Sequence, residues 1–189
     1  LEFRRVLFRS PDPAPGSAND RIIRTERLIL APHTPDDYQA CLALWSNPEV
    51  VRFISGKPSN DEEGWARFLR FFGLWAVLGY GYWTVREAAT GDYVGEVGFG
   101  DFHRDMEPAF GPTPEIGWAL NPRGQGKGYA SEAVRAVLQW LEARRGRERT
   151  VCMINEANTP SVRVAQKAGY VEYARCDYKG SPVVLYERI

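Results

Sequence analysis

Hydrophobic residues recur along this sequence at two spacings, one typical of helices and one typical of strands. After residue 60, and again after residue 129, apolar side chains return every three or four positions, which predicts two amphipathic helices. Short runs of β-branched and aromatic residues, bounded by turn residues, predict strands. In chain order the expected elements are a strand near 27–33, a helix over 34–46, a helix from 60, strands at 82–86, 93–99 and 115–120, a helix ending near 146, a strand at 150–154, a helix over 159–168, and strands at 170–178 and 183–189.

This order of elements predicts the α/β (α+β) class, with one mixed, mostly antiparallel sheet and helices on both faces. The strands at 82–86 and 93–99 flank the turn sequence Ala-Thr-Gly-Asp and should form an antiparallel hairpin. Only the strand, helix, strand passage from 115 to 154 requires a parallel crossover. In the helix from residue 60, one apolar stripe is interpreted as core, with one wall of a substrate groove as the alternative: Trp65, Phe68, Leu69, Phe72 and Trp75.

Length and composition predict one domain. The chain has 189 residues, of which 44% are hydrophobic and 25% are charged, as is ordinary for a globular protein. We expect residues 21–189 to form this domain and residues 1–20 to be a disordered tail, because the stretch before residue 21 is rich in Pro, Ala and Gly. Residues 1–10 match neither following stretch in character, so a non-native origin for them is left open.

Charge balance, the length of apolar runs and the spacing of cysteines and histidines argue against several classes of partner. Twenty-four basic residues balance twenty-four acidic ones, which supplies no overall attraction to nucleic acid or to an anionic membrane. No apolar run approaches the roughly 20 residues that span a bilayer. The three cysteines and two histidines lack the spacing of zinc ligands. We therefore expect a cytoplasmic protein with no metal, no nucleic acid and no membrane as partners.

The most informative segment is the glycine-rich loop between the strand at 115–120 and the following helix. Gly124, Gly126 and Gly128 allow a tight turn whose backbone N–H groups point into one space. The start of the helix adds four unpaired N–H donors and about half a positive charge. Together these features predict a binding site for a phosphate or diphosphate group.

The spacing of the glycines separates the known kinds of phosphate-binding loop. A Walker loop needs Gly-Lys followed by Ser or Thr, whereas Lys127 is followed by Gly128. A Rossmann loop needs its third glycine three positions after the second, early in a wholly parallel unit, and this chain has neither feature. A loop that merely turns the chain is the alternative without function.

The loop resembles the coenzyme A motif of the GNAT N-acetyltransferase superfamily, which reads Arg or Gln, two residues, Gly, one residue, Gly or Ala. Arg123, Gly126 and Gly128 satisfy it. Further stretches between residues 24 and 189 resemble the RimJ/RimL-like branch, the ribosomal-protein-alanine N-acetyltransferases. They are TERL at 25–28, EIGW at 115–118, NTPSVRV at 158–164 and GY at 169–170.

The resemblance implies a GNAT fold of about seven strands with acetyl-CoA as co-substrate. In that fold the strands at 115–120 and 150–154 splay apart, and the pantetheine arm lies between them. Asn158 has an alternative interpretation as a helix cap, and Ser161 as an ordinary helix-start residue. The residues that the resemblance places against the cofactor are Leu120, Arg123, Gly124, Gln125, Gly126, Lys127, Gly128, Tyr129, Ala130, Asn158 and Ser161.

Acetyl transfer to an amine requires a base, because free amines are largely protonated at neutral pH. General-base help is worth roughly 100- to 10,000-fold in rate. Glu115 is the first candidate, since several GNAT enzymes carry a glutamate on the equivalent strand; Glu96 and Asp177 are the alternatives. The leaving thiolate needs a hydrogen-bond donor, for which Ser161 is preferred over Tyr170 because it matches the serine of the branch.

A covalent route through an acetyl-cysteine is the mechanistic alternative, with Cys152 as its candidate nucleophile. This route needs a thiol of lowered pKa beside a base, and neither histidine can be placed there. We therefore interpret Cys152 as a core residue.

The expected reaction is direct attack of a primary amine on acetyl-CoA in a ternary complex. The branch resemblance implies a protein N-terminal amine as acceptor. A small cationic amine, such as an antibiotic or a polyamine, is an alternative because the loop at 101–114 carries Asp101, Asp105 and Glu107. An acyl-CoA-binding regulatory module without catalysis is the alternative of another class. The protein is expected to be a monomer or a homodimer.

Overall fold

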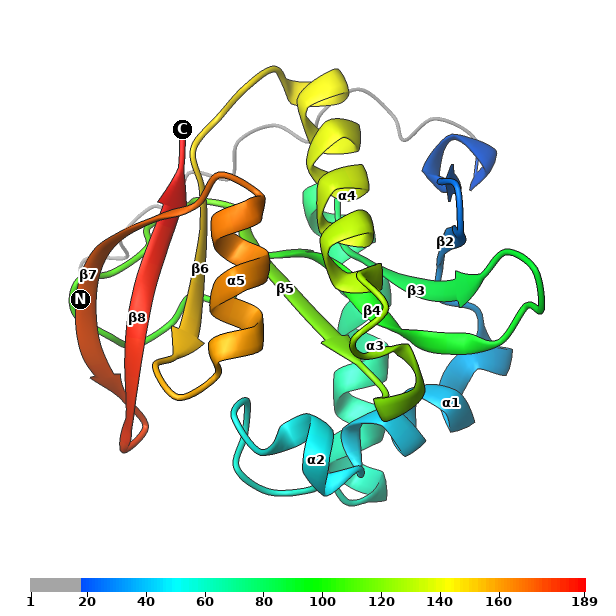
Figure 1. Cartoon of the computed structure of the whole chain (residues 1–189), viewed down its shortest axis with the longest axis horizontal. Helices are drawn as coiled ribbons and strands as arrows, with labels where there is room; N and C mark the ends of the chain where they lie inside the picture. The colour runs from blue at the N-terminus through cyan, green and yellow to red at the C-terminus, as the bar shows by residue number, and fades with distance from the viewer. Residues whose placement is uncertain (1–17) are drawn as a thin grey trace, which may run out of the picture.

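Eight strands form a single sheet in the computed structural model, which describes residues 18–189 (Figure 1). The strands are β1 (Ile23–Arg24), β2 (Leu28–Pro32), β3 (Tyr82–Glu87), β4 (Tyr93–Gly100), β5 (Glu115–Leu120), β6 (Thr150–Asn155), β7 (Val171–Tyr178) and β8 (Ser181–Arg188). The helices are α1 (Tyr38–Trp45), α2 (Pro48–Val51), α3 (Asp61–Leu78), α4 (Tyr129–Arg145) and α5 (Thr159–Lys167), with 3₁₀ turns η1 (Ala18–Arg21), η2 (Pro35–Asp37) and η3 (Pro122–Gly124).

The predicted mixed sheet is confirmed, and β1 adds a short strand that the hydrophobic pattern did not separate from β2. The strand order is β1-β2-β3-β4-β5-β6-β8-β7, and every neighbouring pair is antiparallel except β5 and β6. These two strands pair only at Glu115 and Val151, although they continue to Leu120 and Asn155. The predicted splay between them is therefore present, and Figure 1 shows the two strands diverging.

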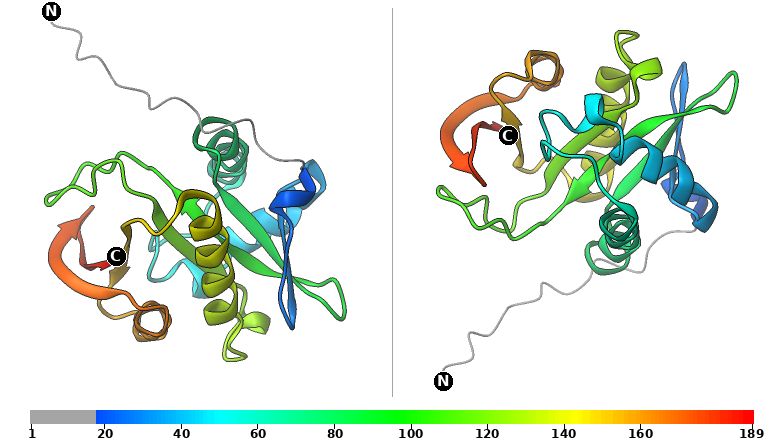
Figure 2. Two further views of the ribbon diagram at one scale, coloured as in Figure 1. Left: turned by 90° about the horizontal axis from the view of Figure 1, so that it is seen from above. Right: turned by 90° about the horizontal axis from the view of Figure 1, so that it is seen from below.

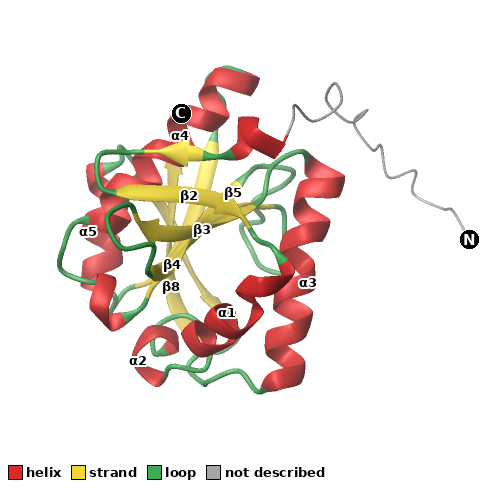
Figure 3. Cartoon of the chain, turned by 90° about the vertical axis from the view of Figure 1, so that its right-hand side faces the viewer, coloured by secondary structure: helices red, strands yellow, loops and turns green. Residues whose placement is uncertain are grey.

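Helices cover both faces of the sheet, as the order of elements predicts (Figures 2 and 3). Helices α4 and α5 lie on one face, where Val134 and Val137 of α4 share a core with Val97 and Phe99 of β4. Helices α1 to α3 lie on the other face. There, Phe68 of α3 belongs to a second core with side chains of α1, α2 and the sheet.

The interpretation of the whole α3 stripe as core is wrong for three of its five residues. Phe68 and Trp75 are buried, but Trp65, Leu69 and Phe72 are 48%, 49% and 37% exposed. The sequence of this helix carries apolar residues on both of its faces, so spacing alone does not identify the face that meets the sheet. The buried face consists of Gly64, Phe68, Phe71, Leu74 and Trp75.

The predicted tail, residues 1–20, overlaps the described chain only at its last three residues. Residues 18–20 form η1 together with Arg21 instead of a tail. The indole Nε1 of Trp140 and the guanidinium of Arg144 donate to the carbonyl oxygen of Asp20, at 3.1 and 2.7 Å, which fixes this turn against α4. The predictions for residues 1–17 lie outside the described residues.

Candidate active site

The loop after β5 is folded by its own side chains. Oδ1 of Asn121 accepts from the N–H of Gly124 at 2.9 Å, and Nδ2 donates to the carbonyl of Tyr93 at 2.9 Å. Gly124 is buried, and a Cβ built there would lie 3.1 Å from the carbonyl oxygen of Val94. A side chain at this position would push the loop away from β4, so Gly124 serves the packing of the loop.

The next residues form an open set of backbone donors. Gly126 and Gly128 have φ angles of 75° and 82°, in the left-handed region that favours glycine. Within residues 18–189, no hydrogen bond uses the N–H groups of Gly126, Lys127 or Gly128. The first helical turn adds the N–H groups of Tyr129 and Ala130, which have no partner inside the helix. These donors fit the predicted diphosphate.

One side chain of the loop, that of Arg123, remains available on its surface. Arg123 is exposed, and it has no partner within the described part of the chain. The amide of Gln125 donates to the carbonyl of Leu120 at 3.0 Å, which leaves its backbone beside the glycines. Arg123 can therefore meet an anion held by the loop.

One carboxylate ties the start of α4 to the N-terminal strands. Glu132 accepts from the hydroxyl of Thr25 at 2.6 Å and from Nε of Arg27 at 2.8 Å, while Nη1 of Arg27 also donates to the carbonyl of Lys127 at 2.9 Å. This explains why the TERL stretch accompanies the glycine loop. Sequence reasoning missed Glu132, although an acid in the first turn after Gly128 is a recognisable helix-start signal.

The side chains of Lys127 and Tyr129 lie against β3 and do not extend into the loop's open side. Nζ of Lys127 and the hydroxyl of Tyr129 both contact Oε1 of Glu87, at 3.1 and 2.6 Å. The side chains of both residues therefore anchor the loop to the hairpin of β3 and β4, and within the described chain only their backbone N–H groups stay free.

The open end of the β5–β6 gap lies beside the start of α5. Oδ1 of Asn158 accepts from the N–H of Ser161 at 3.3 Å, so Asn158 caps α5, as the alternative interpretation states. The hydroxyl of Ser161 is half-buried and has no hydrogen bond within residues 18–189. It stays available as a donor, and the cofactor roles of Leu120, Asn158 and Ser161 stay predictions.

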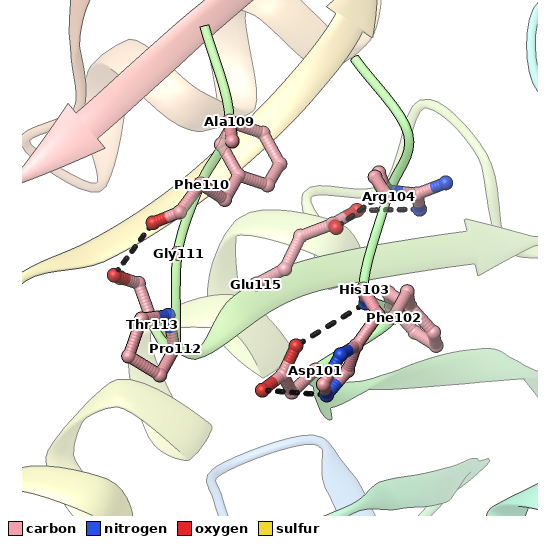
Figure 4. A pocket seen from close by; sticks show the side chains of 10 residues that line it. All are labelled: Asp101, Phe102, His103, Arg104, Ala109, Phe110, Gly111, Pro112, Thr113 and Glu115. Carbon is pink, nitrogen blue, oxygen red and sulfur yellow. Dashed lines mark hydrogen bonds and ion pairs between the residues drawn. The ribbon is translucent and has the colours of Figure 1, made fainter. Parts of the chain in front are cut away.

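Glu115 lines a pocket of about 360 Å³ that is otherwise built from residues 101–104 and 109–113 (Figure 4). Both carboxylate oxygens accept from the guanidinium of Arg104, at 2.6 Å each, and Arg104 also donates to the hydroxyl of Tyr178 at 3.1 Å. Burial raises the pKa of Glu115, although the Arg104 charge opposes this shift. The carboxylate is thus next to space for a substrate.

The two alternative carboxylates have other surroundings. Glu96 is fully buried: it accepts from the hydroxyl of Tyr93 at 2.6 Å and from Nε1 of Trp45 at 2.8 Å, and Nε2 of His33 lies 3.1 Å away. Asp177 is exposed and accepts from the N–H of Gly180 in the β7–β8 turn. Glu115 is therefore the best placed of the three.

Both carboxylate oxygens of Glu96 already have partners, which predicts a structural role for this residue. Burial alone would raise the pKa of Glu96, but the contacts with His33, Tyr93 and Trp45 outweigh it and hold the pKa below its usual value. We expect Glu96→Gln to lower the free energy of unfolding by about 3 kcal/mol, because an amide NH₂ would face a buried donor.

Urea unfolding at several pH values measures this prediction. The carboxylate stabilises the fold fully above the ordinary glutamate pKa of about 4.3 and loses its effect as the pH falls through the lower folded value. The difference between wild type and variant should therefore shrink at acid pH. Glu62→Gln, at an exposed position of α3, is the control. Equal stability of Glu96→Gln and wild type at pH 7 would contradict the structural role of Glu96.

Tyr170 and Cys152 belong to the core. The hydroxyl of Tyr170 shares a hydrogen bond of 2.7 Å with Oγ1 of Thr150, and both residues are buried. Burial also raises the pKa of the Cys152 thiol well above its ordinary value, the opposite of what a nucleophile requires. The interpretation of Cys152 as core is confirmed, and Tyr170 already has a partner.

Sequence reasoning missed Tyr82 of β3. Its side chain packs with α3 on the second face and reaches β5, where a Cβ on Gly117 would collide with the Tyr82 hydroxyl. Gly117 inside a strand was the available signal, since such a glycine often marks close approach of another group. Tyr82 and Glu115 thus share the face that opens toward the pocket.

Residues 18–189 contain no group of three or more His, Cys, Asp or Glu side chains arranged to hold a metal ion. Among the helices of the same residues, none has both the length and the apolar composition needed to cross a bilayer.

Known proteins resemble the chain over most of its length. A family model for the acetyltransferase (GNAT) domain matches residues 27–171. The uncharacterized N-acetyltransferase YnaD of Bacillus subtilis (strain 168) is 28% identical over 162 residues, which cover 84% of this chain and 89% of YnaD. A Bordetella pertussis protein assigned to the GnaT-family acetyltransferases superposes with a TM-score of 0.80 at 28% identity, covering 89% of this chain and 99% of that chain.

A further solved structure carries the name of the predicted branch. RimL, a ribosomal L7/L12 alpha-N-protein acetyltransferase in complex with coenzyme A, superposes with a TM-score of 0.73 at 19% identity, covering 89% of this chain and 97% of RimL. At this identity the likeness shows the fold alone. The family match runs from the residue before β2 to the start of β7 and includes the glycine loop, so the chain belongs to the GNAT family of N-acetyltransferases.

Proposed function

We propose that the protein transfers the acetyl group of acetyl-CoA to a primary amine by direct attack in a ternary complex. The observation that carries this proposal is that β5 borders two openings, one at each of its ends. The free backbone donors and the β5–β6 gap lie at the C-terminal end of the strand, and the pocket lies at its N-terminal end, beside Glu115. Two substrates can therefore approach one strand from different sides.

The cofactor side fits coenzyme A. The N–H groups of residues 126–130 and the side chain of Arg123 would hold the diphosphate, and Gly126 has no heavy atom within 4 Å of an added Cβ, so the loop leaves room for it. Beyond Glu115, the edge of β5 that faces β6 has no strand partner, so its backbone N–H and C=O groups suit the amides of the pantetheine arm. The thioester supplies an activated acetyl group.

The acceptor side supplies the proton transfers. The amine nitrogen forms a bond to the carbonyl carbon, the carbon–sulfur bond breaks, and the amine proton passes to Glu115 directly or through a water molecule. The Ser161 hydroxyl donates to the leaving sulfur. The raised pKa of Glu115 supports its role, because a base works best when its pKa lies near the working pH.

A regulatory module that binds acyl-CoA without catalysis is the second candidate. The observation in its favour is the engagement of both Glu115 oxygens by Arg104. Turnover requires this ion pair to loosen or to leave a lone pair accessible to the amine, whereas binding alone does not. Catalysis and binding must therefore be measured separately.

A panel of amines tests the proposal. Release of free thiol from acetyl-CoA is followed with N-terminal peptides, amino acids, polyamines and aminoglycosides, and thermal unfolding is recorded with acetyl-CoA, NAD and ATP. We expect turnover with at least one amine and stabilisation by acetyl-CoA alone. Stabilisation without any turnover would favour the binding module, and no response to acetyl-CoA would contradict both candidates.

A further inference from the structure

Arg67 of α3 is a largely buried cation without a partner. Its Nε atom is inaccessible to solvent and has no hydrogen bond, and no ion pair engages its guanidinium within residues 18–189. The guanidinium lies 3.8 Å from the centre of the Trp45 ring. Stacking on an aromatic face holds the group in place but leaves its hydrogen-bonding edge unused.

The charges around Arg67 compensate it only in part, because the attraction of the Glu96 carboxylate is outweighed by burial and by Arg70. The groups that face it are Arg70, Glu96, Tyr82 and Cys41. The Glu96 carboxylate already holds its own three contacts, and Arg70 adds a second positive charge. Burial, reinforced by Arg70, lowers the pKa of the Arg67 guanidinium. An unpaired buried charge costs stability, so an external anion would gain from pairing with it.

Arg70 extends this cation toward the acceptor pocket. It lies one helical turn after Arg67, is exposed, and has no hydrogen bond or ion pair within the described residues. Its guanidinium lies 5.8 Å from the centre of the Phe102 ring, and Phe102 lines the pocket. Arg104 contacts the same ring at 4.9 Å, but its charge is already paired with Glu115. Arg70 therefore adjoins the pocket wall, and Arg67 lies one turn before it on the same helix.

We propose that Arg67 and Arg70 form an anion-binding subsite of the acceptor pocket, so that the preferred acceptor is an amine that also carries a carboxylate or a phosphate. This inference rests on the proposed function and adds the class of acceptor. Guanidinium groups match both anions with paired hydrogen bonds. A polyamine would bring a positive charge to this subsite and is disfavoured.

Matched acceptor pairs test the subsite. Each amino acid of a small panel is compared with its carboxamide, and phosphoethanolamine is compared with ethanolamine, which separates carboxylate from phosphate recognition. Following thiol release, we expect kcat/KM for the anionic member to exceed that of its neutral partner by about 10- to 100-fold. Equal or higher values for the neutral members and for spermidine would overturn the proposal.

The variant Arg67→Met removes the charge and keeps an apolar stem on Trp45. We expect the preference for anionic acceptors to fall to about one, with an unchanged KM for acetyl-CoA, and Arg70→Gln to reduce it in part. The free Arg67→Met protein should unfold at the same or a higher temperature, since an uncompensated charge has been removed. Arg24→Gln, at an exposed position on β1, is the control.

Two results would assign Arg67 a merely structural role: an unchanged preference in Arg67→Met, or a marked loss of its stability without ligand. Failure of the proposed function is distinguishable, because it appears as no turnover with any amine. In that case calorimetric titration of the coenzyme A-bound protein with each matched pair decides the subsite. Tighter binding of the anionic member, lost in Arg67→Met, supports it, and equal binding overturns it.

Discussion

Gly126→Glu is expected to abolish the stabilisation of this protein by acetyl-CoA. The left-handed φ of 75° at Gly126 leaves a side chain in open space, with no heavy atom within 4 Å of its Cβ. The new carboxylate would therefore enter the space of the diphosphate without clashing with the fold. Juxtaposed like charges cost several kcal/mol, so affinity should fall by about 100-fold or more.

Gly91→Glu is the matched control for this variant. Gly91 lies in the turn between β3 and β4, with a φ of 78° and likewise nothing within 4 Å of an added Cβ. Both variants carry the same backbone strain and added charge, so both should lose a similar, small amount of stability. Thermal unfolding with and without acetyl-CoA separates them: the ligand-induced shift should persist in Gly91→Glu. A full shift in Gly126→Glu would remove the loop from the cofactor site.

The glycine loop and the strand and helix that flank it were predictable because their determinants are local in sequence. Glycine spacing, a preceding strand and a following amphipathic helix are all contained in residues 115–141, and each leaves a recognisable pattern. The mixed sheet followed from the order of elements in the same way. The pattern did not show the contacts of Glu132, because its partners Thr25 and Arg27 come from the other end of the chain.

Other features depend on contacts between residues that are distant in sequence, and single-sequence patterns do not contain them. Glu96 resembles any strand glutamate until His33 and Trp45 are seen to enclose it. Arg67 likewise fits the polar positions of an amphipathic helix, since nothing in its neighbourhood along the chain shows that Trp45 covers it. The burial of Trp65 was wrongly predicted for a different reason: α3 carries apolar residues on two faces, and spacing alone does not identify the one that meets the sheet.

Glu115→Gln is expected to lower kcat by about 100- to 10,000-fold, the usual contribution of a general base. The amide cannot take up the amine proton, while the glycine loop proposed to hold acetyl-CoA lies at the other end of β5, so the affinity for acetyl-CoA should be unchanged. Thiol-release kinetics across pH measure both effects. In the wild type, the rate should fall as the pH drops through the pKa of Glu115, and burial places that limb above the ordinary glutamate value.

Arg104→Met distinguishes two roles for Glu115: a general base, or a residue that only holds Arg104 in place. This variant removes the guanidinium that opposes protonation, so the pKa of Glu115 should rise and the acid limb of the rate profile should move to higher pH. Activity at alkaline pH should then survive in Arg104→Met but not in Glu115→Gln. If the ion pair itself were the requirement, both variants would lose activity to the same extent and neither limb would move, and the base would have to be sought elsewhere on the pocket wall.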